Sequence, residues 1–194
     1  MTSPRRLGRV VGVLLPLAAA VAGCATTTVT VQPSPQPPVC SASASAWVLW
    51  WPRWRPDQKD VADREAAAAA GLSDFFAESR CFARAEVQRA ARPGAPAVAL
   101  GPATANGTVS KVIGIEVREL GPVVRLLSSA ALVEGGTEVV LGITEFAPES
   151  GATMREFTVH WHNGGAGVVK GVSSLPADMQ SALRAGLQPA VGAR

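Results

Sequence analysis

The sequence predicts an α+β fold, a two-layer sandwich with a mostly antiparallel sheet and the element order β-α-β-β-β-β-α. Short runs in which apolar and polar residues alternate are typical of strands with one buried face. Two longer segments, one near each end of the domain, repeat apolar residues at helical spacing. We expect a single domain over residues 40–189, followed by a short tail over residues 190–194.

An export signal is predicted for residues 1–23. Three arginines form a positive start, an apolar run over Val10–Val21 follows, and small residues precede Cys24. The apolar run is too short to cross a bilayer, which takes roughly 20 such residues. The tetrapeptide Val21-Ala22-Gly23-Cys24 resembles a bacterial lipobox. This resemblance implies cleavage before Cys24 and attachment of lipid, including a fatty acyl chain, to that residue.

Residues 24–39 are rich in Thr and Pro and carry no charged side chain. Four prolines between residues 33 and 38 favour an extended, polyproline-like backbone. We therefore expect this segment to be a semi-stiff tether that lifts the domain off the lipid surface.

The charge of the mature chain argues against a nucleic-acid partner. The formal charge of the full chain is +3, and the signal holds three arginines and no other ionisable residue, which leaves 3 − 3 = 0 for the rest. We find no basic patch with interleaved aromatic residues and no nucleic-acid motif. No cofactor is predicted.

The remaining two cysteines fit an exported protein. With lipid on Cys24, Cys40 and Cys81 are left, and an even pair in such a protein predicts one disulfide. Closing a loop of about 40 residues would stabilise the fold by roughly 3 to 4 kcal/mol. The alternative is two buried free thiols.

The first half of the domain predicts a strand, a helix and an edge strand. The strand is short and aromatic and ends at a proline, whereas the helix has acids near its start and four apolar residues on one face. A segment dense in Pro, Gly and Ala then predicts a loop. The expected ranges are Ala46–Trp51 for the strand, Asp57 or Asp60 to Arg80 for the helix, Phe82–Arg89 for the edge strand and Arg92–Gly107 for the loop.

The second half has the stronger strand pattern. Its first strand alternates clearly and should end at Gly121-Pro122, and two later strands flank a turn-rich segment, which predicts an antiparallel hairpin. Apolar residues then recur every four positions in a last helix capped by Ser173 or Ser174 and ended by Pro189. The three strands are expected at Lys111–Leu120, Glu138–Phe146 and Arg155–His162.

Two apolar segments are candidate contact surfaces. One holds four of the five tryptophans within eight residues, namely Trp47, Trp50, Trp51 and Trp54. An exposed indole combines a large apolar face with one donor, whereas the alternative is that these residues form the core and rim of the first strand. The other segment, residues 121–136, includes Val123, Leu126 and Leu132, which would either cover the sheet or form an apolar patch of the kind that marks partner sites.

Two further features favour structural interpretations. His160 and His162 share one face of a strand, but a metal site needs at least a third protein ligand and no spacing indicates one, so no metal is predicted. The glycine-rich stretch over residues 163–171 lies between a strand and a helix, yet it matches neither the dinucleotide fingerprint nor the P-loop. We expect a glycine-rich exit from a strand.

The lipobox, the proline-rich tether and one domain of this element order resemble small envelope lipoproteins. The domain is similar in element order to the N-terminal domain of the translocation protein TolB and to outer-membrane activators of peptidoglycan synthases. In a Gram-negative cell, Ala25 after the lipidated cysteine resembles default sorting to the inner leaflet of the outer membrane, facing the periplasm. In a Gram-positive cell the anchor would lie on the exterior of the plasma membrane.

Two function classes follow. The favoured one is a non-enzymatic accessory module that is held on the membrane by lipid and contacts an envelope protein. The alternative is an enzyme or small-ligand binder that acts on cell-wall or lipid material. No local catalytic motif supports the alternative, although folding can bring distant groups together.

Overall fold

The computed structural model describes residues 25–34, 36–91, 109–127 and 132–188, with side chains left out at 125–127 and 132–133. The export signal, Cys24, the predicted loop over Arg92–Gly107 and the C-terminal tail all lie outside these ranges. The described elements are β1 (Thr26–Gln32), β2 (Ser41–Pro52), α1 (Val61–Glu78), β3 (Phe82–Arg89), β4 (Lys111–Leu127), β5 (Leu132–Phe146), β6 (Thr153–Ala166), a 3₁₀ turn (Val172–Ser174) and α3 (Leu175–Leu187).

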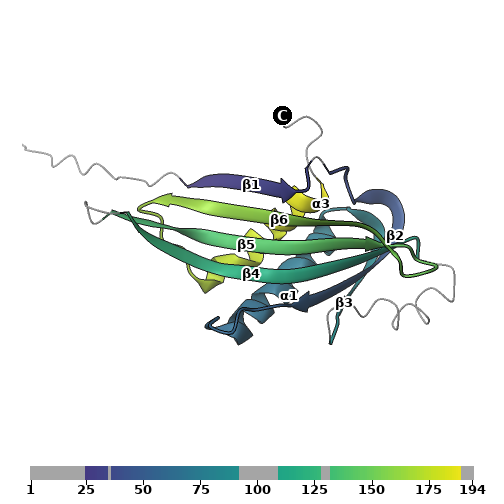
Figure 1. Cartoon of the computed structure of the whole chain (residues 1–194), viewed down its shortest axis with the longest axis horizontal. Coiled ribbons are helices and arrows are strands. Elements are labelled where there is room, and N and C mark those ends of the chain that lie inside the picture. The colour runs from purple at the N-terminus through teal and green to yellow at the C-terminus, as the bar shows by residue number, and fades with distance from the viewer. Residues whose placement is uncertain (1–24, 35, 92–108, 128–131, 189–194) are drawn as a thin grey trace, which may run out of the picture.

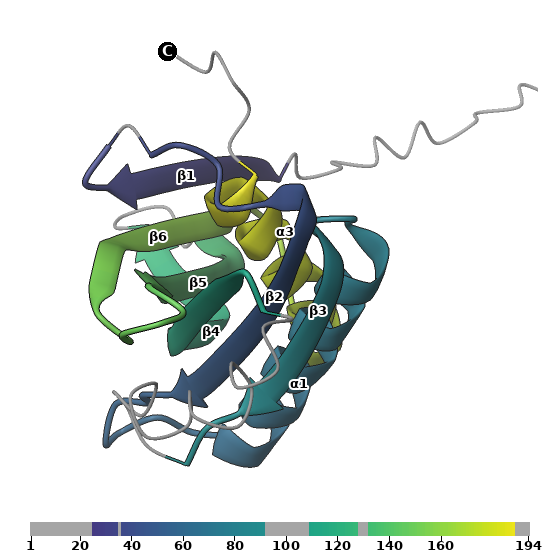
Figure 2. The same cartoon turned by 90° about the vertical axis from the view of Figure 1, so that its right-hand side faces the viewer.

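The six strands form one mixed sheet in the order β1-β6-β5-β4-β2-β3. The neighbours from β1 to β4 are antiparallel, while β2 is parallel to both β4 and β3. Both helices cover the same face of this sheet, as Figures 1 and 2 show. The α+β class, the two layers and the β5–β6 hairpin are therefore confirmed.

The core lies between the helices and the sheet. Each helix buries a stripe of apolar residues, and the strands contribute every second residue. The helices approach each other closely at Gly71, where a Cβ atom would stand 2.7 Å from the Cβ of Met179. A glycine at this position lets α1 and α3 pack side by side.

The first strand differs from the prediction. Residues 24–39 were expected to form a tether, but Thr26–Gln32 pair with β6 as an edge strand, so the predicted element order lacks β1. The alternation of Thr and Val suits a strand, and a neighbouring strand with an open edge supplies its hydrogen bonds. Six of its seven residues are exposed, so β1 adds little to the core.

The segment after β1 is also held against the domain. The Arg155 guanidinium donates a 2.8 Å hydrogen bond to the carbonyl oxygen of Pro37, and the backbone N–H of Val39 donates one of 3.0 Å to Leu187. Cys40 then forms the disulfide with Cys81, with 4.6 Å between the Cα atoms. The disulfide prediction is thus confirmed in this structure.

The strand predicted to end at Gly121-Pro122 instead continues to Leu127. β2 pairs with β4 only as far as Val117, so beyond that residue β4 pairs with β5 alone. A proline has no N–H to donate and is tolerated where one edge of a strand is open. The prediction was wrong because an isolated sequence does not show where the neighbouring strand stops.

Candidate functional site

The candidate site lies where β2 leaves the sheet. The register between β4 and β5 shifts between Val117 and Glu119, which makes Arg118 the additional residue of a β-bulge. Directly beside it, the N–H of Arg53 donates a 2.8 Å hydrogen bond to the carbonyl oxygen of Val117, and the chain turns from β2 towards α1. Bulges bend a strand and re-aim its side chains, which here brings arginines from two segments together.

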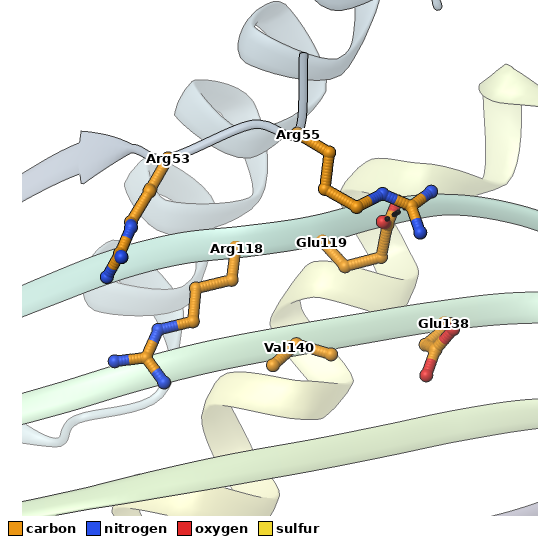
Figure 3. Close-up of a pocket in the computed structure, with 6 residues that line it drawn as sticks. All are labelled: Arg53, Arg55, Arg118, Glu119, Glu138 and Val140. Carbon is orange, nitrogen blue, oxygen red and sulfur yellow. Dashed lines mark ion pairs between the residues drawn. The ribbon is translucent and has the colours of Figure 1, made fainter. Parts of the chain in front are cut away.

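These arginines line an open hollow of about 300 Å³. Figure 3 shows Arg53 and Arg55 on the segment after β2, Arg118 and Glu119 on β4, and two residues of β5 on its floor. The complete lining is Arg53, Arg55, Arg118, Glu119, Glu138 and Val140.

Glu116 is the acid under one side of the hollow. Its carboxylate accepts hydrogen bonds from Arg118 and from Nε1 of Trp51, the latter at 3.3 Å, and Arg53 lies 3.5 Å away. Burial alone would raise the pKa of Glu116, but these donors and the positive charges of the two arginines outweigh it and hold the pKa below its ordinary value. The carboxylate is therefore ionised at neutral pH.

Glu119 is the acid under the other side. It accepts a 2.8 Å hydrogen bond from the Gln58 amide and one of 3.0 Å from Arg64, and Arg55 lies 3.4 Å away. Arg64 also donates to the carbonyl oxygen of Leu120 at 2.6 Å. Four side chains from β4, α1 and the segment between β2 and α1 are thus held in one network.

The arginine and glutamate side chains at this site differ in their exposure to solvent. The side chains of Arg53 and Arg55 are 66% and 65% exposed, whereas those of Glu116 and Glu119 are 10% and 14% exposed. Solvent therefore meets guanidinium groups, with the carboxylates beneath them. Guanidinium groups bind carboxylate and phosphate oxygens through pairs of hydrogen bonds, so this arrangement is chemically suited to an anionic group.

The predicted tryptophan surface is not exposed. Trp50 lies in the core beneath the helices, Trp47 and Trp51 lie in a second apolar cluster on the opposite face, and all three are buried. Trp54 is half-buried against the main core. The expected split of Trp47 and Trp51 from Trp50 is correct, and both faces of β2 are covered at these three residues. A contact role therefore stays a prediction only for Trp54.

The second predicted contact segment belongs to the extended hairpin of β4 and β5. Val123 is half-buried and the next residue, Val124, is exposed. Leu126 and Leu132 lie on the paired strands, but their side chains are outside the described part. A contact role for this segment remains a prediction.

The two histidines lie on β6, and residues 163–166 of the glycine-rich stretch, expected to follow the strand, instead extend it. His160 is exposed and His162 half-buried on β6, and within the described ranges no three His, Cys, Asp or Glu residues gather as metal ligands. Gly164 lies in β6, where a Cβ would stand 2.4 Å from the carbonyl oxygen of Gly135. Among the helices described, none is both long and apolar enough to cross a membrane.

Sequence reasoning missed the arginine hollow. Arg53 and Arg55 alternate with Trp54 directly after a strand, and this alternation was the available signal. The alternation of apolar and polar residues over Lys111–Leu120 does not reveal the bulge that aims the Arg118 side chain. The hollow forms only when β4 continues beyond β2.

No family model and no curated protein match this chain. Among solved structures, it is similar to a PelC dodecamer from Paraburkholderia phytofirmans, with TM-score 0.45, 16% identity, and coverage of 81% of this chain and 95% of that chain. A putative neuraminyllactose-binding hemagglutinin homolog from Helicobacter pylori has TM-score 0.41 and 12% identity over 77% of this chain and 84% of that one. Lipoprotein GNA1162 from Neisseria meningitidis has TM-score 0.34 and 19% identity over 74% of this chain and 97% of that one. The likeness is a distant one of α+β architecture.

Proposed function

We propose that this protein is a lipid-anchored module of the bacterial envelope that acts by contact with a partner, and that the arginine hollow binds an anionic group of that partner. The lipobox ending at Cys24 supports the anchor. The observation that carries the contact role is the exposure of Arg53 and Arg55 above two covered carboxylates. An envelope protein that presents acidic side chains matches this chemistry.

The geometry favours binding over catalysis at this hollow. Its lining consists of three arginines, two glutamates and a valine. Of the two lining glutamates, Glu119 is occupied by arginine and amide donors, and Glu116 beneath the arginines is occupied by Arg118, so neither of these two carboxylates is held ready to accept a proton from a substrate. The hollow is therefore suited to hold charge in place.

Site-specific photocrosslinking in cells tests the contact role. A photoreactive amino acid at Val140, on the floor of the hollow, should yield a defined adduct with a partner. The adduct should fall at least tenfold in an Arg53→Glu, Arg55→Glu background, because two attractive pairs become repulsive. Arg84→Glu, at an exposed position on β3, is the matched control and should leave the adduct unchanged.

Two results would contradict the contact role. An adduct that survives both reversals would show that the arginines do not hold the partner. Saturable binding of inorganic phosphate to the purified chain, lost in the same double variant and with no protein adduct in cells, would instead support the alternative of a small-ligand binder.

A further inference from the structure

The start of β1, the end of β6, the end of β4 and the start of β5 lie at one end of the sheet (Figure 1). The register defines this end residue by residue. Thr26 pairs with Gly164, Gly164 with Gly136, and Gly136 with Val123, so these four residues form one row across four strands. We refer to this row and everything beyond it as the β1 end of the sheet.

The β1 end is also where the chain emerges from its predicted lipid anchor. Only Ala25 separates Cys24 from Thr26. Two Cα to Cα steps span at most about 7 Å. With lipid on Cys24, as the proposed function requires, the row that contains Thr26 therefore cannot stand far above the membrane surface. A long tether would have allowed any orientation, but the pairing of β1 removes it.

Exposed valines gather at this same end. Val124 is 69% exposed and Val169 is 93% exposed. Val124 pairs directly with Gly135, and a Cβ on Gly135 would stand 2.0 Å from the carbonyl oxygen of Val168. Opposite residues in a sheet point to the same face. The side chain of Val124 and the segment Val168-Val169 are thus neighbours on one face of the β1 end.

The backbone of the hairpin continues beyond this row. Arg125 pairs with Glu134, Leu126 with Val133 and Leu127 with Leu132. At about 3.3 Å per residue, the last pair stands about 13 Å past Val123. The hairpin therefore extends at least as far as Cys24 can reach from Thr26, and four of the five residues in Val123–Leu127 are apolar.

We propose that the β1 end lies in the surface of a phospholipid bilayer, with Val124 and Val169 at the boundary between headgroups and acyl chains. The lipid on Cys24 supplies most of the affinity, since each buried methylene adds to it. The valines add a second contact and thereby set the orientation of the domain. Val140 lies four residues along β5 from Gly136, so the arginine hollow opens about 13 Å from this end.

Depth-dependent fluorescence quenching tests the orientation. The mature lipidated protein, which begins at Cys24, is reconstituted into vesicles of phosphatidylethanolamine and phosphatidylglycerol, and a single fluorophore is attached to Val124→Cys or Val169→Cys. Labelling is selective because Cys40 and Cys81 are bonded to each other. Met154→Cys is the matched control, because Met154 is 65% exposed and lies ten residues along β6 from Gly164, about 33 Å away.

A nitroxide carried on the lipid chains should quench the two valine labels at least threefold more than the Met154 label. Equal quenching at all three positions would overturn the proposal. Valine labels protected from both the lipid nitroxide and aqueous iodide would also overturn it, because a protein would then cover this end. The mass of the N-terminal peptide is measured on the same sample. Lipid on Cys24 without selective quenching refutes only the orientation, whereas an unmodified Cys24 refutes the anchor itself.

Discussion

Neutralising Glu116 should destabilise the fold by an amount that depends on pH. Glu116→Gln removes the negative charge but keeps an oxygen that accepts from Trp51. The hydrogen bond from Arg118 then loses its charge assistance, and such bonds stabilise proteins by about 1.5 to 3 kcal/mol when both groups are charged. The pair with exposed Arg53 adds at most about 1 kcal/mol. We expect a loss of about 1 to 2 kcal/mol at pH 7.

The pH dependence follows from the direction of the pKa shift. The folded state holds the pKa of Glu116 below its ordinary value of 4.5. The stability that comes from this group is therefore complete above pH 4.5 and is lost as the pH falls through the folded-state pKa. The difference between wild type and Glu116→Gln should be constant from pH 7 to about pH 5.5 and should shrink below pH 4.5.

Urea unfolding followed by tryptophan fluorescence measures this difference. With an m-value of about 2 kcal/mol per molar, the midpoint should fall by about 0.5 to 1 M at pH 7. Glu138→Gln is the control, because Glu138 lines the same hollow and makes no ion pair with a described residue. A Glu116→Gln midpoint equal to wild type at pH 7, or a difference that does not change with pH, would refute the account of Glu116.

Three further outcomes are expected. Replacing Cys40 and Cys81 by Ser should lower the free energy of unfolding by about 3 to 4 kcal/mol in urea titrations, and an unchanged midpoint would show that the disulfide contributes nothing. Gly71→Ala should lower the free energy of unfolding by about 1 to 3 kcal/mol, because the added methyl overlaps α3. Gly171→Ala is the control and should be neutral, since a Cβ there meets no atom within 4 Å. Equal effects of the two variants in thermal melts would contradict the packing argument. Cys24→Ser should leave an uncleaved or soluble precursor, and a variant of normal mature mass that still fractionates with membranes after a salt wash would exclude lipidation at this residue.

Much of the secondary structure could be predicted because its cause is local. The apolar stripe of α1 repeats every three or four residues, and Phe157, Val159 and Trp161 alternate on β6, so each pattern already contains the face that it buries. The pairing of Cys40 with Cys81 was also open to prediction, because the predicted export and lipidation of Cys24 leave those two thiols for one another.

The tertiary structure decided where strands begin, pair and stop. Thr26–Gln32 have no buried face of their own, so only the open edge of β6 makes them a strand. The tryptophans of β2 look like a surface in isolation, but a strand covered on both faces buries them all.

The lipobox-like motif and the apolar faces of the two helices could be recognised from the sequence alone, because each pattern is formed by residues that are close together in the chain. The arginine hollow was not. It requires β2 to end at Pro52 while β4 continues, and a bulge at Arg118 to turn one more guanidinium towards the other two. The first is a relation between strands more than sixty residues apart and the second between strands more than twenty residues apart. The free energy that sets them comes from pairing and packing that no single segment contains.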